Sequence, residues 1–468
     1  MVHKYRLGDN NFVLDVNSSC VYIVDDLAYK LLDCVDENTK EFPFEIIKEF
    51  PGVLEEKLRE CYDQLYELKI SNRLFSKSND KIFKYVSENL PLKSLCLNVA
   101  HDCNLRCEYC FAAKGNFGGK RVLMPLEVGI RSIDFLVENS GSRHNLEVDF
   151  FGGEPLMNFD VVRKIVEYSR GIQKKYSKNF RFTITTNGLL LDDEKIDFIN
   201  QEMCNVVLSL DGRKSVNDNL RLLPSRQGCY ERILPLFKKL LKTRPANKNY
   251  YVRGTFTKHN LDFSNDVLHL SDLGFKHISI EPVVCNSDLP YCIEESDIDK
   301  IKSEYERLFN IMLKRSENGS DFSFFHFFID LDASPCAIKR MRGCGCGNEY
   351  LAITPEGDIY PCHQFVGKFE WMMGNILQKT FNKNIRETFS QINVSSKDDC
   401  RDCFAKFYCS GGCSANNWNY NQNLSKPYKV SCELQKKRLE CALALQSIKK
   451  ISKCDSIDRL VNICKKGT

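Results

Sequence analysis

The sequence has no apolar run long enough to cross a lipid bilayer, and its first residues, MVHKYRLGDNNF, contain no apolar segment of signal-peptide type. Its charge is nearly balanced, because 66 basic and 62 acidic residues give a formal net charge of +4. So small a net charge does not indicate nucleic acid or an anionic membrane as the partner. No segment of about 20–50 residues repeats, which excludes a solenoid. These absences predict a cytoplasmic globular protein, and 468 residues suffice for two or three domains.

Cysteine, by contrast, is abundant, with 23 residues. Disulfides are disfavoured in a reducing cytoplasm, and a chain of this length needs no covalent crosslinks, so the clustered cysteines are interpreted as metal ligands. One group is tight, at Cys103, Cys107 and Cys110, and a second extends from Cys336 to Cys432. The scattered cysteines are expected to be small core residues: Cys20, Cys34, Cys61, Cys96, Cys204 and Cys229.

Residues 1–85 begin with three short alternating runs, KYRLG, NFVLDVN and CVYIVD, which predict a small antiparallel sheet. Helical periodicity follows in DLAYKLLDCV (26–35) and in LEEKLRECYDQLYELKI (54–70). Together they predict a winged-helix-like α+β module. Such modules bind peptide or nucleic acid, and the alternative is an N-terminal packing extension; the pattern alone favours neither.

Across residues 86–330, short apolar runs alternate with longer amphipathic stretches. The six strand candidates are SLCLNVA, LEVDFFGGEP, RFTITTNG, NVVLSLDG, YYVRGTFT and HISIEPVV. This alternation predicts an α/β fold whose parallel sheet curves into a partial (β/α)6 TIM-like barrel. In such folds the site lies at the carboxyl ends of the strands, where each of these runs ends in a polar or glycine cluster.

The cysteine triplet follows the first of these strands, in VAHDCNLRCEYCFAAKG (99–115). A [4Fe–4S] cubane is normally held by four thiolates, so three cysteines on one loop leave one iron for a small molecule. The alternative is zinc, but zinc sites usually add a second Cys or His pair, and none lies near this loop. The spacing C-x3-C-x2-C, with Tyr109 before the last cysteine, therefore favours an iron–sulfur cluster.

At these residues the chain resembles the radical S-adenosylmethionine (SAM) superfamily, whose cluster loop reads C-x3-C-x-aromatic-C. GGEP (152–155) resembles the SAM motif of that superfamily, in which backbone and a carboxylate hold the methionine ammonium. The resemblance implies that Cys103, Cys107 and Cys110 hold the catalytic cluster. It also implies a set of residues that contribute to SAM binding: Tyr109, Gly152, Gly153, Glu154, Asn187, Ser209, Arg221 and Arg253.

Residues 331–468 resemble the SPASM extension, which carries two auxiliary iron–sulfur clusters, and are expected to include a C-terminal helix. The resemblance assigns cysteines to both clusters: Cys344, Cys362 and Cys413 to the first, and Cys400, Cys403, Cys409 and Cys432 to the second. Zinc stays the alternative for any single subset, but the array has no His partners spaced within it, and so many thiolates suit iron–sulfur clusters. Three [4Fe–4S] clusters and SAM are therefore the expected cofactors.

The segment GCGCGNEYLAITPEGDIYPCHQFVG (343–367), together with residues 1–85, resembles the maturases of six-cysteine (SCIFF) precursor peptides. In that family the N-terminal module pairs with a leader peptide through a strand edge. The resemblance implies a cysteine-rich precursor peptide as partner and thioether crosslinks, of sactipeptide or ranthipeptide type, as product. A 5′-deoxyadenosyl radical would abstract hydrogen from a carbon, of Thr by family analogy, to which a cysteine sulfur then bonds. Flavodoxin or ferredoxin is the expected electron donor.

Two other functions stay open. An anaerobic sulfatase-maturating enzyme shares the cysteine pattern but oxidises Cys or Ser of a folded enzyme to formylglycine, and the module at residues 1–85 argues against it. A non-catalytic iron–sulfur electron carrier would need neither GGEP nor a barrel.

Cys346 departs from the motif, because a small or polar residue is more usual at its position. It lies two residues from Cys344, and side chains on so short an extended link would strain to reach separate irons. The first auxiliary cluster is therefore expected to keep an open iron that binds the precursor thiolate. The alternative is a fully ligated cluster with a fourth ligand from Cys346 or Cys336.

The aromatic run FSFFHFF (322–328) is expected to be a buried core strand or helix, with lining of a peptide channel as the alternative. His326 within it is expected to be a hydrogen-bonded core residue.

Overall fold

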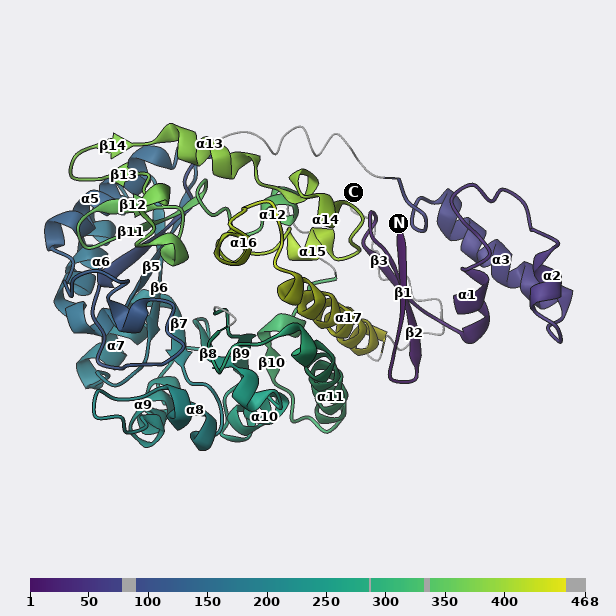
Figure 1. Cartoon of the computed structure of the whole chain (residues 1–468), viewed down its shortest axis with the longest axis horizontal. Coiled ribbons are helices and arrows are strands. Elements are labelled where there is room, and N and C mark those ends of the chain that lie inside the picture. The colour runs from purple at the N-terminus through teal and green to yellow at the C-terminus, as the bar shows by residue number, and fades with distance from the viewer. Residues whose placement is uncertain (78–89, 286–287, 332–336, 452–468) are drawn as a thin grey trace.

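The computed structural model describes residues 1–77, 90–285, 288–331 and 337–451 (Figure 1). The strands form a three-stranded sheet in the order β1-β2-β3 and an eleven-stranded sheet in the order β10-β9-β8-β7-β6-β5-β4-β11-β12-β13-β14. The small sheet and its helices lie at one end of the molecule and the large sheet at the other, with α17 between them (Figure 1). Within the described ranges no helix is both long and apolar enough to span a bilayer.

The N-terminal module begins with three antiparallel strands: β1 (Val2–Leu7), β2 (Asn10–Asp15) and β3 (Cys20–Val24). Three helices follow: α1 (Asp26–Leu31), α2 (Ile46–Glu49) and α3 (Glu55–Ile70). Successive side chains of β2 point to opposite faces of the sheet, and both faces are covered. Val13 packs with Leu65 of α3, whereas Leu14 packs with Leu439 and Leu443 of the C-terminal helix.

The predicted helix over residues 26–35 is shorter than expected and ends at Leu31. The next N–H groups, those of Asp33 and Cys34, bond to carbonyls three residues back, so the chain tightens into turns instead of continuing the helix. The second predicted helix, over 54–70, is observed over Glu55–Ile70.

Six consecutive parallel strands form the barrel wall in chain order: β4 (Ser94–Ala100), β5 (Asn145–Gly152), β6 (Asn179–Thr186), β7 (Met203–Ser209), β8 (Asn249–Phe256) and β9 (His277–Pro282). The barrel helices are α5 (Leu126–Asn139), α6 (Phe159–Gln173), α7 (Asp193–Glu202), α8 (Lys214–Leu220), α9 (Tyr230–Lys242), α10 (Ser264–Asp272) and α11 (Ile298–Glu317). Parallel neighbours need such crossovers, and this alternation confirms the predicted α/β partial barrel.

The C-terminal segment extends the sheet at both edges. The strand β10 (Ser323–Phe324) pairs with β9, and β11 (Tyr350–Ile353) pairs with β4, both in parallel. Three short antiparallel strands follow: β12 (Asp358–Tyr360), β13 (Gly374–Asn375) and β14 (Thr380–Phe381). The remaining helices are α12 (Ala337–Arg342), α13 (Lys383–Gln391), α14 (Asp398–Arg401), α15 (Lys406–Cys409), α16 (Ser414–Asn421) and α17 (Lys429–Ile451).

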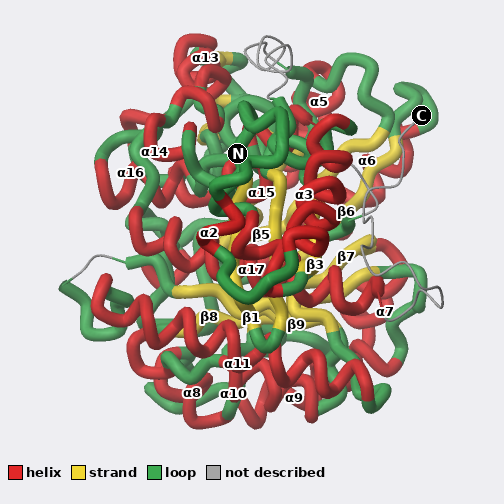
Figure 2. Tube along the Cα trace, turned by 90° about the vertical axis from the view of Figure 1, so that its right-hand side faces the viewer, coloured by secondary structure: helices red, strands yellow, loops and turns green. Residues whose placement is uncertain are grey.

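The helix α17 joins the two ends of the molecule. Its Leu434 and Leu445 belong to the barrel core, whereas its Leu439 and Leu443 pack under the small sheet. Seen from the N-terminal end, α2 and α3 lie in front of α17 (Figure 2). The N-terminal module is therefore anchored to the rest of the chain through an apolar face of this helix.

Candidate functional site

The predicted site residues gather at the carboxyl ends of the parallel strands. Cys103 follows β4, Gly152 ends β5, Asn187 follows β6 and Ser209 ends β7. Arg253 of β8 lies in register with Ser209. Because parallel strands run in one direction, these ends share one edge of the barrel, which is where such folds place their sites.

The cysteine loop brings three thiols together. Burial raises the pKa of Cys103 and of Cys107 to about 12, and the neighbouring Cys110 thiol raises both further. The Cys110 N–H donates to the Cys107 carbonyl at 3.3 Å, which folds this part of the loop into a turn. Such buried thiols stay protonated unless a positively charged group lowers their pKa, as coordinated metal ions do.

The Gly152–Glu154 segment packs directly against the cysteine loop. The Gly153 N–H donates to the Ala100 carbonyl at 2.7 Å, and the Glu154 N–H donates to the Asp102 carbonyl at 2.8 Å. A Cβ atom at Gly153 would lie 2.1 Å from the Asp102 carbonyl oxygen, so this approach requires glycine. The two motifs are therefore parts of one backbone unit.

The Glu154 carboxylate is buried and accepts three hydrogen bonds. Its donors are the Leu156 N–H at 3.1 Å, the Thr186 hydroxyl at 2.7 Å and the Asn187 N–H at 2.8 Å. Burial raises the pKa of Glu154 to about 7, against the effect of these donors. The carboxylate thus ties the end of β5 to the end of β6, and one of its about four lone-pair positions remains for a further donor.

Tyr109 and Arg221 meet in a buried network with Asp211, which the sequence analysis did not single out. The Tyr109 hydroxyl donates to Asp211 at 2.6 Å and accepts from Arg221 at 2.8 Å, while Arg221 lies 3.7 Å from the Asp211 carboxylate. The buried Arg221 Nε has no hydrogen-bond partner among the described residues. The signal for Asp211 was its place directly after a strand, in SLDG.

Asn187 and Arg253 differ in their relation to the triplet. The Asn187 side chain donates to the Asn104 side chain at 2.8 Å and lies 3.6 Å from the Cys103 sulfur. Arg253 instead lies 3.8 Å from the Glu281 carboxylate of β9, and its side chain is 55% exposed. The structure therefore places Asn187 beside the cysteine loop, whereas the Arg253 side chain lies beside Glu281 of β9.

A first C-terminal group contains the thiols of Cys344, Cys362 and Cys413, and Cys346 lies among them. Burial raises the pKa of Cys413 to about 12 and also raises the pKa of Cys344, and the nearby Cys362 thiol adds to both shifts. Loss of solvation raises the pKa of the half-buried Cys346, and the same three thiols add to this shift. Cys336, the other fourth-ligand candidate, lies outside the described residues.

A second C-terminal group contains four thiols: Cys400, Cys403, Cys409 and Cys432. The Lys397 side chain, 1% exposed, lies beside this group and donates to the Gly411 carbonyl at 2.5 Å. Burial lowers the pKa of Lys397, and the surrounding cysteines oppose that shift. A buried ammonium next to several thiols is an environment that favours thiolates.

A cavity of about 670 Å³ opens between the barrel edge and both C-terminal groups. Cys344 and Cys413 of the first group line it, as do Cys409 and Cys432 of the second. The barrel contributes residues of β9 and of the aromatic run, including Glu281.

The aromatic run at 322–328 divides between core and cavity. Phe324 and Phe327 are buried, as predicted, but Phe325 and Phe328 are 48% and 67% exposed and line the cavity, as the alternative had it. A short strand followed by a single 3-10 turn directs neighbouring rings in opposite directions. His326 is hydrogen-bonded, as predicted, 3.1 Å from an Arg438 nitrogen, but the residue as a whole is half-buried and lines the cavity, so its placement in the core was wrong.

The scattered cysteines follow the core prediction in part. Cys96 and Cys229 are buried, whereas Cys34, Cys61 and Cys204 are half-buried. Cys20 is buried and disulfide-bonded, which the expectation of reduced thiols did not predict.

The three cysteine groups suit polynuclear clusters. Within the described part of the chain, no three His, Cys, Asp or Glu side chains converge closely enough to bind one metal ion. A cubane distributes its thiolates over separate irons, so thiols that are close to one another without converging on a point fit it.

The site thus combines a partial barrel, three half-buried thiols after its first strand and two further groups of thiols in the C-terminal segment. This arrangement is that of a protein that holds a cofactor through cysteines. Residues 97–261 match the Radical SAM superfamily, and residues 344–404 match SPASM, an iron-sulfur cluster-binding domain. The chain thus carries a Radical SAM match over its barrel and a SPASM match over its C-terminal cysteines.

Several known proteins are similar to this chain at low identity. The cysteine-type anaerobic sulfatase-maturating enzyme of Clostridium novyi is 25% identical over 350 residues, which are 69% of this chain and 89% of that protein. The antilisterial bacteriocin subtilosin biosynthesis protein AlbA of Bacillus subtilis is 24% identical over 71% of this chain and 69% of that protein. The structure of Streptococcus suis SuiB bound to precursor peptide SuiA has the same fold, with a TM-score of 0.52 over 91% of this chain and 97% of SuiB at 15% identity.

Proposed function

We propose that this protein is a maturase that forms thioether crosslinks, from cysteine sulfur to carbon, in a cysteine-rich precursor peptide. Cys103, Cys107 and Cys110 hold a [4Fe–4S] cluster whose remaining iron is left for SAM. When bound, these groups supply a 5′-deoxyadenosyl radical by one-electron reductive cleavage of SAM. Flavodoxin or ferredoxin provides that electron.

The residues around the triplet bind and orient SAM in this proposal. The backbone of Gly152 and Gly153 and the remaining lone pair of Glu154 receive the methionine ammonium. Arg221, whose Nε has no partner among the described residues, donates to the methionine carboxylate or the ribose. Tyr109 orients Arg221 through a 2.8 Å hydrogen bond. Ser209, Asn187 and Arg253 complete the set at the neighbouring strand ends.

Each C-terminal cysteine group holds one auxiliary cluster, which gives three clusters in all. Forming a thioether removes a hydrogen atom from carbon and a proton and an electron from the cysteine thiol. The hydrogen atom goes to the radical, the electron goes to an auxiliary cluster, and the thiol proton is released to solvent. The cavity between the barrel edge and both groups is where a peptide can approach the auxiliary clusters.

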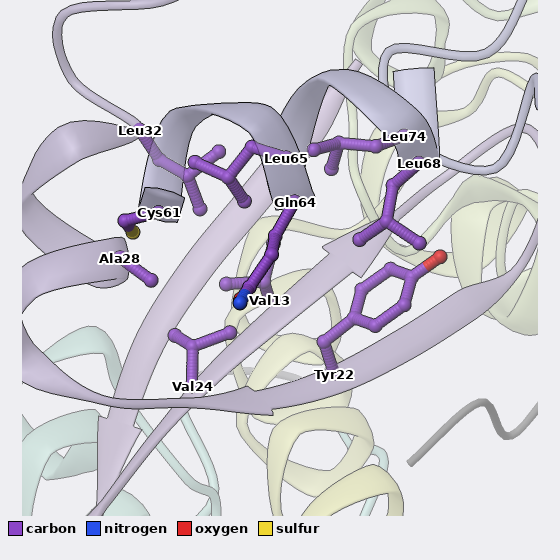
Figure 3. A pocket seen from close by; sticks show the side chains of 10 residues that line it. All are labelled: Val13, Tyr22, Val24, Ala28, Leu32, Cys61, Gln64, Leu65, Leu68 and Leu74. Carbon is purple, nitrogen blue, oxygen red and sulfur yellow. The ribbon is translucent and has the colours of Figure 1, made fainter. Parts of the chain in front are cut away.

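The observation that supports a peptide as the substrate is the groove beside β3 in the N-terminal module (Figure 3). The strand β3 is an edge of its sheet, and an edge strand pairs with an extended peptide through its backbone. The groove next to it is largely apolar and is lined by Val13, Tyr22, Val24, Ala28, Leu32, Cys61, Gln64, Leu65, Leu68 and Leu74. Side chains of α3 face those of the strands across it, so a leader segment paired with β3 would lie beside an apolar surface (Figure 3).

The test uses anaerobically reconstituted full-length protein, SAM, a reductant and a synthetic peptide with a leader and several cysteines. Loss of two hydrogens per crosslink, with cysteine thiols becoming unreactive to alkylation, is the expected result. The alternative function, formylglycine formation, replaces a cysteine sulfur by oxygen and so gives a different mass change. That mass change, or 5′-deoxyadenosine formation with no peptide modified under any condition, contradicts the proposal.

A further inference from the structure

Cys346 lies in a tight turn. Its neighbours Gly345 and Gly347 have φ values of +75° and +73°, a conformation that glycine adopts without strain. The Gly345 carbonyl accepts from the N–H groups of Glu349 at 2.8 Å and Tyr350 at 3.1 Å, so the chain reverses here. The expectation of an extended link between Cys344 and Cys346 is therefore wrong. The objection based on it, that the two thiols would strain to reach separate irons, is wrong as well.

This turn places Cys346 beside Cys362. The Gly347 N–H donates both to the Pro361 carbonyl at 2.9 Å and to the Tyr350 carbonyl at 3.0 Å, which pins the turn to the segment that carries Cys362. The Cys346 thiol donates to the Pro361 carbonyl at 3.4 Å and contacts the Cys362 thiol. One backbone hydrogen bond, from Gly347 to Pro361, and two contacts of the thiol therefore hold Cys346 within the first C-terminal group.

Cys96 offers a useful contrast. It also lies near Cys362, but it belongs to β4, and its thiol faces the Asn98 side chain at 3.8 Å. It is a fully buried member of an apolar cluster that also contains Ala352 and Cys362, whereas Cys346 is only partly buried against that cluster. Cys96 is thus a core residue, whereas Cys346 lies on the loop that carries Cys344.

We propose that Cys346 is the fourth thiolate of the first auxiliary cluster, together with Cys344, Cys362 and Cys413. The proposal deepens the proposed function, since it takes from it that this group binds a cubane. Four thiolates saturate the four irons. The precursor thiolate then has no iron to bind here, and the cluster acts as an electron acceptor that faces the cavity through Cys344 and Cys413.

The test isolates the auxiliary sites in the full-length chain by replacing Cys103, Cys107 and Cys110 together with Ala. This background is loaded anaerobically with ⁵⁷Fe, and its iron content, Mössbauer spectrum and reduced EPR spectrum are recorded with and without 2-mercaptoethanol as a thiol probe. We expect about eight irons per chain, the content of two cubanes, and spectra that the thiol leaves unchanged. Neither readout depends on peptide modification.

Adding Cys346→Ala to this background is expected to give one of two results, each of which supports the proposal. Either about four irons are lost, or the iron stays and the spectra now respond to 2-mercaptoethanol. Cys96→Ala is the matched control and should change neither property. Cys346→Ser provides a second variant with a smaller change in volume.

Three outcomes overturn the proposal. The spectra of the background respond to 2-mercaptoethanol while Cys346 is intact, or Cys346→Ala changes neither iron content nor thiol response. The third is a background that binds only about four irons, which means that one C-terminal group holds no cubane and also contradicts the proposed cofactor set.

Discussion

The Tyr109 hydroxyl donates a 2.6 Å hydrogen bond to the Asp211 carboxylate, which ties the cysteine loop after β4 to the loop after β7. Arg221 donates to the same hydroxyl at 2.8 Å and lies 3.7 Å from Asp211. Asp211 compensates the buried Arg221 charge, and Tyr109 connects both to the cysteine triplet. The proposed SAM-binding role of Arg221 therefore depends on the Asp211 carboxylate, which compensates its charge.

Asp211→Ala is expected to destabilise the cluster-free chain by about 3–5 kcal/mol, because it leaves the Arg221 charge buried without a partner. Tyr109→Phe removes hydrogen bonds but no charge, and we expect a smaller loss of about 1–3 kcal/mol. Denaturant unfolding under anaerobic conditions measures both. Equal losses for the two variants would show that Asp211 does not act by charge compensation.

Cys103→Ala, Cys107→Ala and Cys110→Ala are each expected to abolish 5′-deoxyadenosine formation while auxiliary iron is retained, because the three thiols form a group separate from the C-terminal ones. Anaerobic reconstitution, iron analysis and chromatography of the SAM products check this. Cys204→Ala, at a half-buried position in β7, is the control and should keep normal activity. A triplet variant that cleaves SAM at near the unmodified rate refutes the assignment.

Leu68→Glu is expected to weaken leader-peptide binding about tenfold to a hundredfold, because it puts a charge into an apolar groove. Burial of an apolar side chain there would otherwise contribute about 1.5–3 kcal/mol to the free energy of binding. Fluorescence anisotropy with a labelled leader measures the affinity. Leu54→Glu is the matched control, since Leu54 is 76% exposed and does not line the groove. Equal affinities of both variants would exclude this groove as the binding site.

A point substitution is a cleaner test than removing residues 1–85. Deletion should weaken precursor binding while uncoupled SAM cleavage continues, but it would also strip the small sheet from α17. Leu439 and Leu443, which pack under that sheet, would then be exposed and destabilise the remaining chain. Unchanged precursor affinity after deletion contradicts the leader-binding role of the module.

His326→Gln is expected to reduce the pH dependence of stability. Burial lowers the pKa of His326 to about 3, with Glu281 opposing and Arg438 and Arg253 assisting, so the folded ring stays neutral. The unfolded ring gains a proton below about pH 6.5, so this group makes the chain less stable as pH falls from there toward 3, by about 2 kcal/mol at about pH 5. Unfolding free energies of the cluster-free chain at about pH 7 and 5 should show a smaller difference in His326→Gln.

The control for this experiment is His144→Gln, at an exposed position, which should keep the full difference between the two pH values. If His326→Gln shows the same difference as the unmodified chain, the buried neutral ring is not the source of the dependence.

Lys397→Met is expected to lower the reduction potential of the second auxiliary cluster, because it removes a buried positive charge that favours the more negative reduced state. Losing about 1.4–3 kcal/mol of charge interaction corresponds to roughly 60–120 mV for one electron. An EPR-monitored redox titration measures the potential, with the exposed Lys426→Met as control. An unchanged potential would mean that Lys397 has only a packing role.

Much of this architecture follows from local patterns. The strand SLCLNVA was predicted at residues 94–100, where β4 lies, because an apolar run followed by a polar loop is readable without knowledge of its neighbours. The spacing of Cys103, Cys107 and Cys110 likewise determined that three thiols share one loop, since residues this close in sequence cannot lie far apart.

Other features were decided by tertiary contacts. Asp211 became part of the site through Tyr109, which is 102 residues away in the chain. Phe325 and Phe328 face the cavity because the chain turns between them and the buried rings, and no apolar periodicity distinguishes these positions.

The sequence by itself determined the order of strands and helices and the cysteine triplet, because these depend on short-range spacing. The two C-terminal cysteine sets were expected only from the resemblance to the SPASM extension. The tertiary structure alone decided that α17 covers the small sheet and that Cys346 joins Cys362. Both contacts join residues that are distant in the sequence. The helix α17 reaches the small sheet because an apolar face of the helix packs against it, and Cys346 reaches Cys362 because the two glycines beside it adopt positive φ and reverse the chain.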